Sequence, residues 1–364
     1  MSAALDYRRL VLEVYSGKGA GRVIWQPRLE FWYAVNKKRG ALPAHLAHMT
    51  LEEVYDYCHA SIRYFSNPLK VRYHNVRISE EWLNEKNLRR VWETPRGSLS
   101  EVMHFDEWNL SSYNHEYLLK SPEDFRTYEY ILEDETWYWD ADELEQDQRR
   151  VGSRGALMFY ARRSPLQSLF IERMGFERTV YLMMDHPEVI ERHVEAQTAA
   201  DDTMYEVICQ ARPPLFNFGE NIDAHMDPPV YWRKYLLPYY RKRTQQLHAA
   251  DIKTSIHIDG SMKPLLKDIR DCPTTAIEAC TPLPQGDVSL EEIHSALDGK
   301  ILIDGIPALY FLPIYPLETL MECARQVIDM FSPNLILGIS DEPPPDSDIE
   351  RVRLIGELVE NLNR

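Results

Sequence analysis

Polar side chains that can carry protons or bind metal ions follow several short apolar segments of this chain. His257 and Asp259 end one such segment, and because alternate residues of an extended strand project to the same side, both are expected to face the same space. Imidazole and carboxylate together can bind zinc, or act as a general base and its orienting partner. Glu278 and Cys280 repeat this spacing after the next apolar segment and would add a carboxylate and a thiolate. These four residues are therefore predicted metal ligands.

Three further carboxylates stand where an apolar segment ends. Asp304 and Glu220 are candidate catalytic groups, and Asp341 is a fifth candidate metal ligand. Simpler roles are open for some of these residues: Glu220 can form a turn, Asp341 can cap a helix, and Cys280 can be a small buried filler. Arg28 follows the first apolar segment and is also a candidate catalytic residue, because its guanidinium can clamp a carboxylate or phosphate with two hydrogen bonds.

Eight extended segments must position these residues, and they alternate with helical patterns over most of the chain. Such alternation favours βα units and a parallel sheet. In a parallel barrel the carboxyl ends of all strands open on one face, which would bring the polar residues into one site. We therefore predict an α/β fold, a TIM (β/α)8 barrel with an N-terminal helical extension and an insertion between early strands. The expected strands are 22–26, 69–75, 156–160, 214–218, 253–258, 275–279, 300–303 and 334–339.

The stretch from about 79 to 152 breaks this alternation, with a hairpin pattern at 92–101 followed by a run of carboxylates. We predict that the whole chain, 1–364, is one domain in which this stretch is an insertion. It is either a solvated segment or a lid over the site. Apolar residues at helical spacing predict helices at 187–209, 229–250, 290–297, 316–331 and 348–362.

Composition restricts the partners that the chain can have. Its 364 residues carry a net charge of -16, whereas a nucleic-acid binder needs clustered Lys and Arg to displace counterions from phosphates. Its five cysteines lack any CxxC spacing, from which we infer a reducing, cytoplasmic location. The amino terminus has no apolar export signal, and no run of about 18 apolar residues predicts a membrane span. We expect neither a nucleic-acid nor a membrane partner.

Four segments carry a family resemblance: Trp25-Gln26-Pro27-Arg28, the stretch 248–260 with His257 and Asp259, the stretch 276–279 with Glu278, and 335–339 with the proline-rich turn after it. From about Arg22 to its end, the chain resembles the uroporphyrinogen decarboxylase superfamily. This TIM-barrel family includes corrinoid-linked methyltransferases and is related to cobalamin-independent methionine synthase.

Two departures from the family pattern indicate which branch the chain is similar to. Of the arginine-rich signature of the decarboxylases only Arg28 is present, and their aspartate after the next strand has no match. The methyltransferases hold zinc with His-x-Cys and a later Cys; His257 matches the histidine, and Asp259 and Asp341 replace the cysteines. In the methionine synthases a glutamate of the next strand joins the metal, and Glu278 or Cys280 occupies that region. The resemblance implies a zinc site with harder, oxygen-rich ligands.

The resemblance further implies a metal-dependent methyltransferase that moves a methyl group between a small methoxy or methylamine compound and a corrinoid (cobalamin) on a partner protein. It is also compatible with a homodimer. Zinc would lower the pKa of a bound thiol, phenol or water. The direction of transfer stays open, because microscopic reversibility gives both directions the same residues.

Two other functions are weighed against this one. The first is a cofactor-free decarboxylase of the uroporphyrinogen type, in porphyrin metabolism, with Arg28, Arg162 and Arg163 around the substrate carboxylates. The second is a metal- or ligand-binding protein without turnover.

Overall fold

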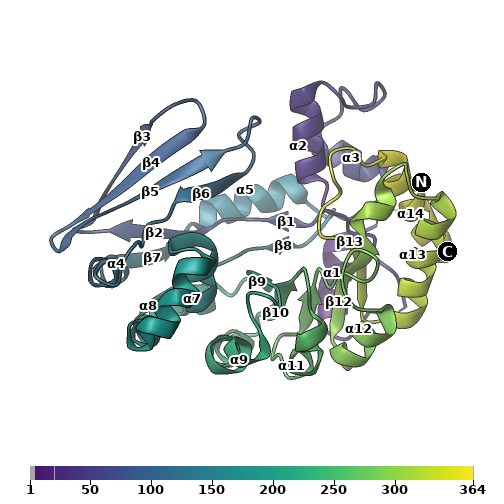
Figure 1. Ribbon diagram of the computed structural model, residues 1–364. Coiled ribbons are helices and arrows are strands. Elements are labelled where there is room, and N and C mark those ends of the chain that lie inside the picture. Colours follow the sequence, from purple (N-terminus) through teal and green to yellow (C-terminus); the bar gives the residue numbers. More distant parts are fainter. Residues whose placement is uncertain (1–4, 20, 364) are drawn as a thin grey trace.

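Five parallel strands form the central sheet of the protein, which a computed structural model describes over residues 5–19 and 21–363 (Figure 1). Each strand pairs in parallel with its neighbours. The α/β fold with a parallel sheet is therefore confirmed, as are the last five predicted strands. In the order of the sheet, the strands are β13 (Leu335–Ser340), β12 (Ile301–Pro307), β11 (Ala276–Glu278), β10 (Lys253–Ile258) and β9 (Leu215–Ile222).

Short extended segments continue the sheet beyond both of its edges. Next to β9, Tyr160 and Asn217 form a parallel bridge, and Tyr160 closely follows β8 (Leu157–Met158). Strand β8 pairs in parallel with β1 (Tyr64–Phe65). Next to β13, Trp25 forms a parallel bridge with Leu337, and the Trp25 carbonyl accepts a 2.7 Å hydrogen bond from the Ser61 N–H, shortly before β1. Hydrogen bonds thus run from one edge of the sheet through these segments to the other edge.

One predicted strand of the main sheet was placed wrongly. The segment 69–75 does contain a strand, β2 (Leu69–Tyr73), but it pairs antiparallel with β7 (Glu135–Trp139) outside the main sheet. The place beside β8 belongs to β1. The physical reason is burial: the residues just before β1 are almost completely buried, whereas β2 is largely half-exposed.

The helices begin and end close to the predicted bounds. In α12, the Ser289 hydroxyl accepts from the Glu292 N–H while the Glu292 carboxylate accepts from the Ser289 N–H, a capping box that fixes the start of the helix. The longer helices include α2 (Glu30–Arg39), α7 (Phe176–Asp185), α8 (Pro187–Ala211), α10 (Leu237–Ala249), α12 (Leu290–Leu297), α13 (Leu317–Phe331) and α14 (Ile349–Leu362). The shorter ones are α3 (Leu51–Tyr57), α6 (Pro165–Ser168), α9 (Pro229–Tyr231) and α11 (Leu266–Arg270).

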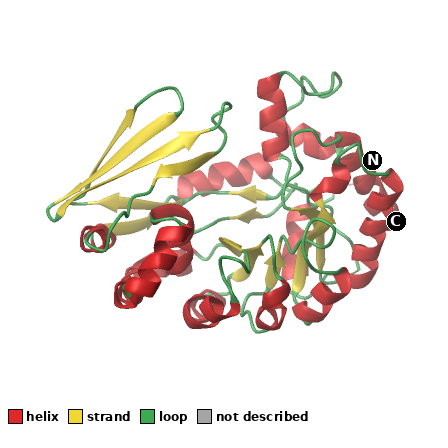
Figure 2. Ribbon diagram, viewed as in Figure 1, coloured by secondary structure: helices red, strands yellow, loops and turns green. Residues whose placement is uncertain are grey.

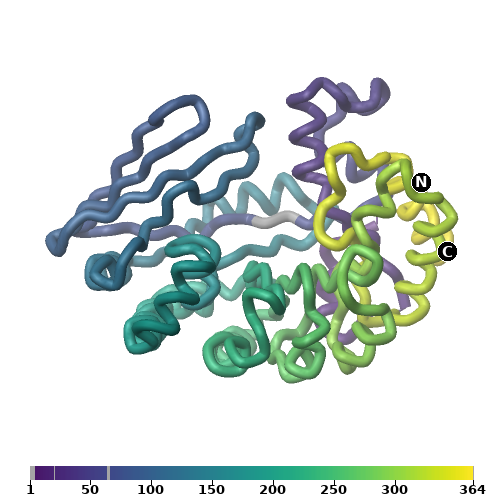
Figure 3. The backbone as a smooth tube through the Cα atoms, viewed as in Figure 1, coloured from purple at the N-terminus to yellow at the C-terminus, as the bar shows by residue number. Residues whose placement is uncertain are grey.

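Helix α1 (Tyr7–Tyr15) covers the amino ends of the parallel strands. Its apolar residues share one buried cluster with the first residues of β9, β11 and β12. At the other terminus, the Asn363 side chain donates a 2.8 Å hydrogen bond to the Val23 carbonyl and accepts a 3.0 Å one from the Val23 N–H. Figure 3 shows the two ends of the chain on the same side of the molecule. With its amino end covered in this way, the sheet has its carboxyl end free for a site.

A second, antiparallel sheet lies apart from the parallel strands, as Figure 2 shows. It contains the predicted hairpin, in which Thr94 pairs with Gly97. Two helices of this region, α4 (Asp124–Glu133) and α5 (Ala141–Val151), lie within the stretch predicted as an insertion, and the role of a lid stays a prediction. Among the described residues, no helix is long and apolar enough to cross a membrane. The strands of the sheet are β3 (Arg77–Trp82), β4 (Asn87–Thr94), β5 (Gly97–Phe105) and β6 (Ser112–Glu116).

Candidate functional site

An arginine that the sequence analysis did not single out occupies the centre of the site. Arg63 directly precedes β1, and its Nη1 donates a 2.7 Å hydrogen bond to Glu278 Oε1. Its Nη2 donates to Asp304 Oδ1 and, at 3.1 Å, to the Gln26 carbonyl. The side chains of Arg63 and Glu278 are fully buried. Because buried charges need partners, Arg63 explains how Glu278 and Asp304 can both be held inside the protein. The sequence signal was an arginine within an apolar extended stretch.

The backbone around this ion-pair network is specialised. Asp304 has a φ of 87°, which is rare for a residue other than glycine and often accompanies function. Gly338 on β13 leaves room for the network, because a Cβ there would overlap Asp304 and Arg63. Burial raises the pKa of Asp304 above its usual range, and the negative charge of Glu278 raises it further. The positive charge of Arg63 lowers this pKa but does not cancel the increase. Asp304 thus lies near the other predicted site residues, but its side chain is buried and does not line the cavity described below.

His257 lies between two carboxylates. Its Nδ1 is 3.5 Å from Glu278 Oε2, and its Nε2 is 3.7 Å from Asp259 Oδ2. Burial disfavours the charged imidazolium, but the contacts with Asp259 and Glu278 outweigh this and raise the pKa of His257 to about 10. Burial likewise opposes ionisation of Glu278, but His257 and Arg63 lower the pKa of that carboxyl. The predicted proximity of these three residues is therefore present in the structure as ion pairs.

A cavity of about 310 Å³ opens at the carboxyl ends of the strands. Arg28 lies at its wall, where Nη1 is 2.5 Å from Asp341 Oδ1 and Nη2 is 2.8 Å from Glu342 Oε1. Most of the polar groups that line it are hydrogen-bond donors. The lining residues are Arg28, Tyr160, Ala161, Arg163, Gly219, Asn221, His257 and Asp341.

Glu220 points away from this cavity, although its neighbours Gly219 and Asn221 line it. Its Oε1 accepts a 2.9 Å hydrogen bond from the Ser164 N–H, and its Oε2 accepts a 2.8 Å one from the Ser164 hydroxyl. Burial raises the pKa of Glu220 to about 7. These contacts are those of a carboxyl group that fixes the start of α6, so they give no support to a catalytic role.

The five predicted metal ligands do not converge on one point. Cys280 is completely buried within the apolar core, where burial raises the pKa of its thiol. Asp341 is paired with Arg28, and Glu278 with Arg63. Within the part of the chain that the structure describes, no three His, Cys, Asp or Glu side chains are grouped so that they could hold a metal ion. The arrangement does not fit zinc, because Arg28 and Arg63 pair with two of the predicted carboxylate ligands and Cys280 is enclosed by apolar side chains.

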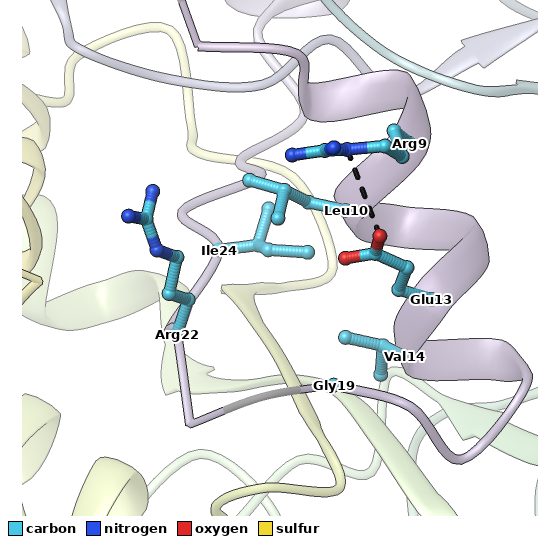
Figure 4. Close-up of a pocket in the computed structure, with 7 residues that line it drawn as sticks. All are labelled: Arg9, Leu10, Glu13, Val14, Gly19, Arg22 and Ile24. Carbon is cyan, nitrogen blue, oxygen red and sulfur yellow. Dashed lines mark ion pairs between the residues drawn. The ribbon is translucent and has the colours of Figure 1, made fainter.

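A smaller cavity of about 220 Å³ lies at the opposite, amino end of the strands, beside α1. Figure 4 shows Arg9 and Glu13 of α1 on one side of it and Arg22 and Ile24 on the other. The Arg9 and Glu13 side chains are 3.6 Å apart, and Arg9 is largely exposed whereas Glu13 is partly buried. None of the predicted site residues lines this cavity.

Comparison with known proteins finds similarity in structure. No protein-family model and no curated protein matches the chain. A methyltransferase from Methanosarcina mazei superposes with a TM-score of 0.59, at 12% sequence identity, over 98% of this chain and 99% of that chain. A B12-independent methionine synthase from Shewanella sp. W3-18-1 gives a TM-score of 0.41 at 10% identity, over 88% of this chain and 89% of that chain, and at that score the similarity carries no argument. The first similarity, at so low an identity, shows a shared fold alone.

Proposed function

We propose that this protein is an enzyme that moves a methyl group from a small, oxygen-bearing substrate, bound at the carboxyl end of a closed (β/α)8 barrel. The closed barrel is inferred from the hydrogen bonds that connect the two edges of the central sheet through Trp25, β1 and β8. The resemblance to the uroporphyrinogen decarboxylase superfamily and the fold shared with a methyltransferase are compatible with this proposal.

The observation that carries the proposal is the lining of the cavity. Arg28, Arg163, Tyr160 and His257 offer hydrogen-bond donors, whereas Asp341 is its single lining carboxylate among the described residues. Such a wall favours an oxygen atom of the substrate over a cationic methylamine, so the methoxy type is the better fit. The volume of about 310 Å³ is near the lower end of ligand pockets, which span about 300–1,000 Å³, and suits a small molecule better than a tetrapyrrole.

In this proposal the side chains of the cavity hold the substrate and supply one proton. Arg28 and Tyr160 bind and orient it. A methyl-accepting nucleophile takes the methyl carbon as the carbon–oxygen bond breaks; the oxygen keeps the electron pair of that bond and takes a proton from the imidazolium of His257, which becomes neutral imidazole. A positioned acid of this kind contributes roughly 100- to 10,000-fold in rate. The acceptor expected from the family resemblance is a corrinoid on a partner protein.

The test uses compounds with a deuterated methoxy group, the purified chain and a reduced corrinoid protein. We expect deuterated methylcobalamin to form together with the free hydroxyl compound, and His257→Gln to lower the rate at least 100-fold. The matched control is His115→Gln, a change at an exposed histidine of β6, with an unchanged rate expected. Absence of methyl transfer from every methoxylated compound offered would contradict the proposal.

A second function has one observation in its favour. Both Arg28 and Arg163 line the cavity, as a cofactor-free decarboxylase would require, while Arg162 does not. This function predicts the release of carbon dioxide from a carboxylated substrate without any methyl acceptor. Measuring carbon dioxide and methyl transfer in parallel separates the two functions.

Whether methyl transfer depends on zinc is tested separately. The predicted zinc ligands Asp341 and Glu278 are paired with arginines, which disfavours zinc binding. We expect elemental analysis of the purified chain, after exposure to zinc, to give much less than one zinc per chain. Wild type and a double variant, His257→Ala with Asp341→Ala, should then contain equal amounts. About one zinc per chain in wild type that disappears in the variant would instead support the metal-dependent mechanism.

A further inference from the structure

The arginines around the cavity differ in how their charges are balanced. Three of them each contact two carboxylates: Arg28 contacts Asp341 and Glu342, Arg63 contacts Glu278 and Asp304, and Arg162 contacts Glu135 and Asp201. Arg163 contacts one, Glu172, among the residues that the structure describes. That carboxylate is shared, since its Oε2 is also 3.8 Å from Arg173 Nη2. By these contacts, the charge of Arg163 is less completely balanced than that of the other three arginines.

Arg163 is also held in a fixed position. Its Nη1 donates to Glu172 Oε1, and its Nη2 donates a 2.7 Å hydrogen bond to Asn221 Oδ1. Its carbonyl accepts a 3.2 Å hydrogen bond from Gln197 Nε2. About a quarter of the side chain stays exposed, at 24%. A guanidinium fixed in this way loses little conformational entropy when it binds a planar anion.

We propose that Arg163 is a specificity-determining residue that binds an anionic group of the substrate, so that the substrate is a small methoxylated carboxylic acid. This inference rests on the proposed function and names its substrate class. The carboxylate would accept hydrogen bonds from Arg163, while the methoxy oxygen lies toward His257, which lines the same cavity. The carboxylate that is recognised and the methoxy oxygen that reacts would then contact different residues of the same cavity, Arg163 and His257.

The inference is tested by binding, without turnover. Isothermal titration is carried out with two acids, 4-methoxybenzoate and methoxyacetate, and with their uncharged counterparts methoxybenzene and dimethoxyethane. We expect wild type to bind at least one acid 10- to 100-fold more tightly than its uncharged counterpart, as about one or two charge-assisted hydrogen bonds would give. Arg163→Gln should lose this preference, and Arg163→Lys should retain part of it.

The matched control is Arg178→Gln, which removes the same charge from an exposed position of α7. Thermal unfolding of each variant shows that it is folded. Equal affinity of Arg163→Gln and wild type for the acids would overturn the inference, and so would the absence of acid binding to wild type. Acid binding through Arg163 without methyl transfer would leave this inference standing and reject the proposed function.

Discussion

Arg63 is the residue on which the ion pairs inside the protein depend. It binds Glu278 and Asp304, and these carboxylates come from two different strands of the central sheet. Removing it would leave buried carboxylates without a counter-charge, which costs far more than losing an exposed pair. Arg63 therefore connects the stability of the fold with the geometry of the site.

For Arg63→Met we expect a loss of about 3–5 kcal/mol in the free energy of unfolding, measured by urea denaturation. The control is Arg154→Met, whose guanidinium pairs with Asp56 at 2.7 Å with both side chains nearly half exposed. Its loss should stay below about 1 kcal/mol. Similar losses in the two variants would show that the buried Arg63 ion pairs contribute no more to the free energy of unfolding than an exposed pair does.

Glu220 and Asp227 are buried carboxyls whose residues are both hydrogen-bonded by Gln167. Burial raises the pKa of each to about 7, and Gln167 Nε2 donates a 3.0 Å hydrogen bond to Asp227 Oδ2. In the unfolded chain such groups ionise near about pH 4. The folded state therefore retains the protons to higher pH, and the stability they contribute is present below about pH 4 and is lost as pH rises through 7.

We accordingly expect the thermal unfolding temperature to fall between about pH 4 and pH 7. Glu220→Gln, which cannot ionise, should remove a part of this slope that corresponds to about 3 kcal/mol. The measurement is calorimetry at matched ionic strength, with Glu177→Gln, an exposed site on α7, as the control. A slope unchanged by Glu220→Gln would be evidence against the raised pKa.

At the level of elements, strand β9 shapes the cavity through Gly219, which has no side chain. A Cβ at Gly219 would lie 2.6 Å from Tyr160 Cδ1 and 2.8 Å from Cε1, so the tyrosine ring lies directly against the strand. Carbon atoms of a protein do not approach one another this closely without a bond, so any side chain at position 219 must displace the Tyr160 ring. The glycine thus sets the position of a cavity wall contributed by the segment after β8.

Gly219→Ala should lower the free energy of unfolding by about 1–3 kcal/mol through overpacking. Adding Tyr160→Ala removes the ring and should relieve that part of the strain. A double-mutant cycle from urea denaturation measures the coupling between the two positions, which we expect to be at least about 1 kcal/mol. Additive effects would mean that the ring does not press on Gly219.

On the scale of the whole molecule, Arg162 connects the stretch predicted as an insertion, 79–152, to helix α8. Its Nη1 donates 2.7 Å hydrogen bonds to both oxygens of Glu135 on β7, and its Nε donates a 2.5 Å bond to Asp201 on α8. All three side chains are largely buried. Strand β7, within that stretch, is therefore attached to α8 by a buried ion-pair network.

Arg162→Gln should loosen this attachment, because Glu135 and Asp201 would be left buried without a cation. We expect hydrogen exchange to speed up in β2 and β7 by at least about tenfold, while β10 to β13 keep their protection. Arg149→Gln, which breaks an exposed pair with Glu145 within α5, serves as the control. Equal acceleration throughout the chain would indicate global destabilisation instead.

Features determined by neighbouring residues were the ones that the sequence predicted well. Helix α12 begins at Leu290 because Ser289 and Glu292 cap each other, and both lie within one turn. Strand β10 has the predicted bounds because its β-branched run ends at the glycine after Asp259. The hairpin of β4 and β5 is likewise a local pattern.

Tertiary structure alone decided which residues share the centre of the site. Arg63 is paired with Glu278 and Asp304, which are 215 and 241 positions further along the chain. Only these partners offset the free-energy cost of burying its charge. Strand β1 is two residues long, too short for a periodic pattern, and it exists because it pairs with β8. The sequence by itself determined a parallel α/β fold with His257, Asp259 and Glu278 close together. Whether those side chains bind a metal or pair with protein groups depends on Arg63 and Arg28, which approach the site from distant parts of the chain. No local sequence pattern indicates that approach.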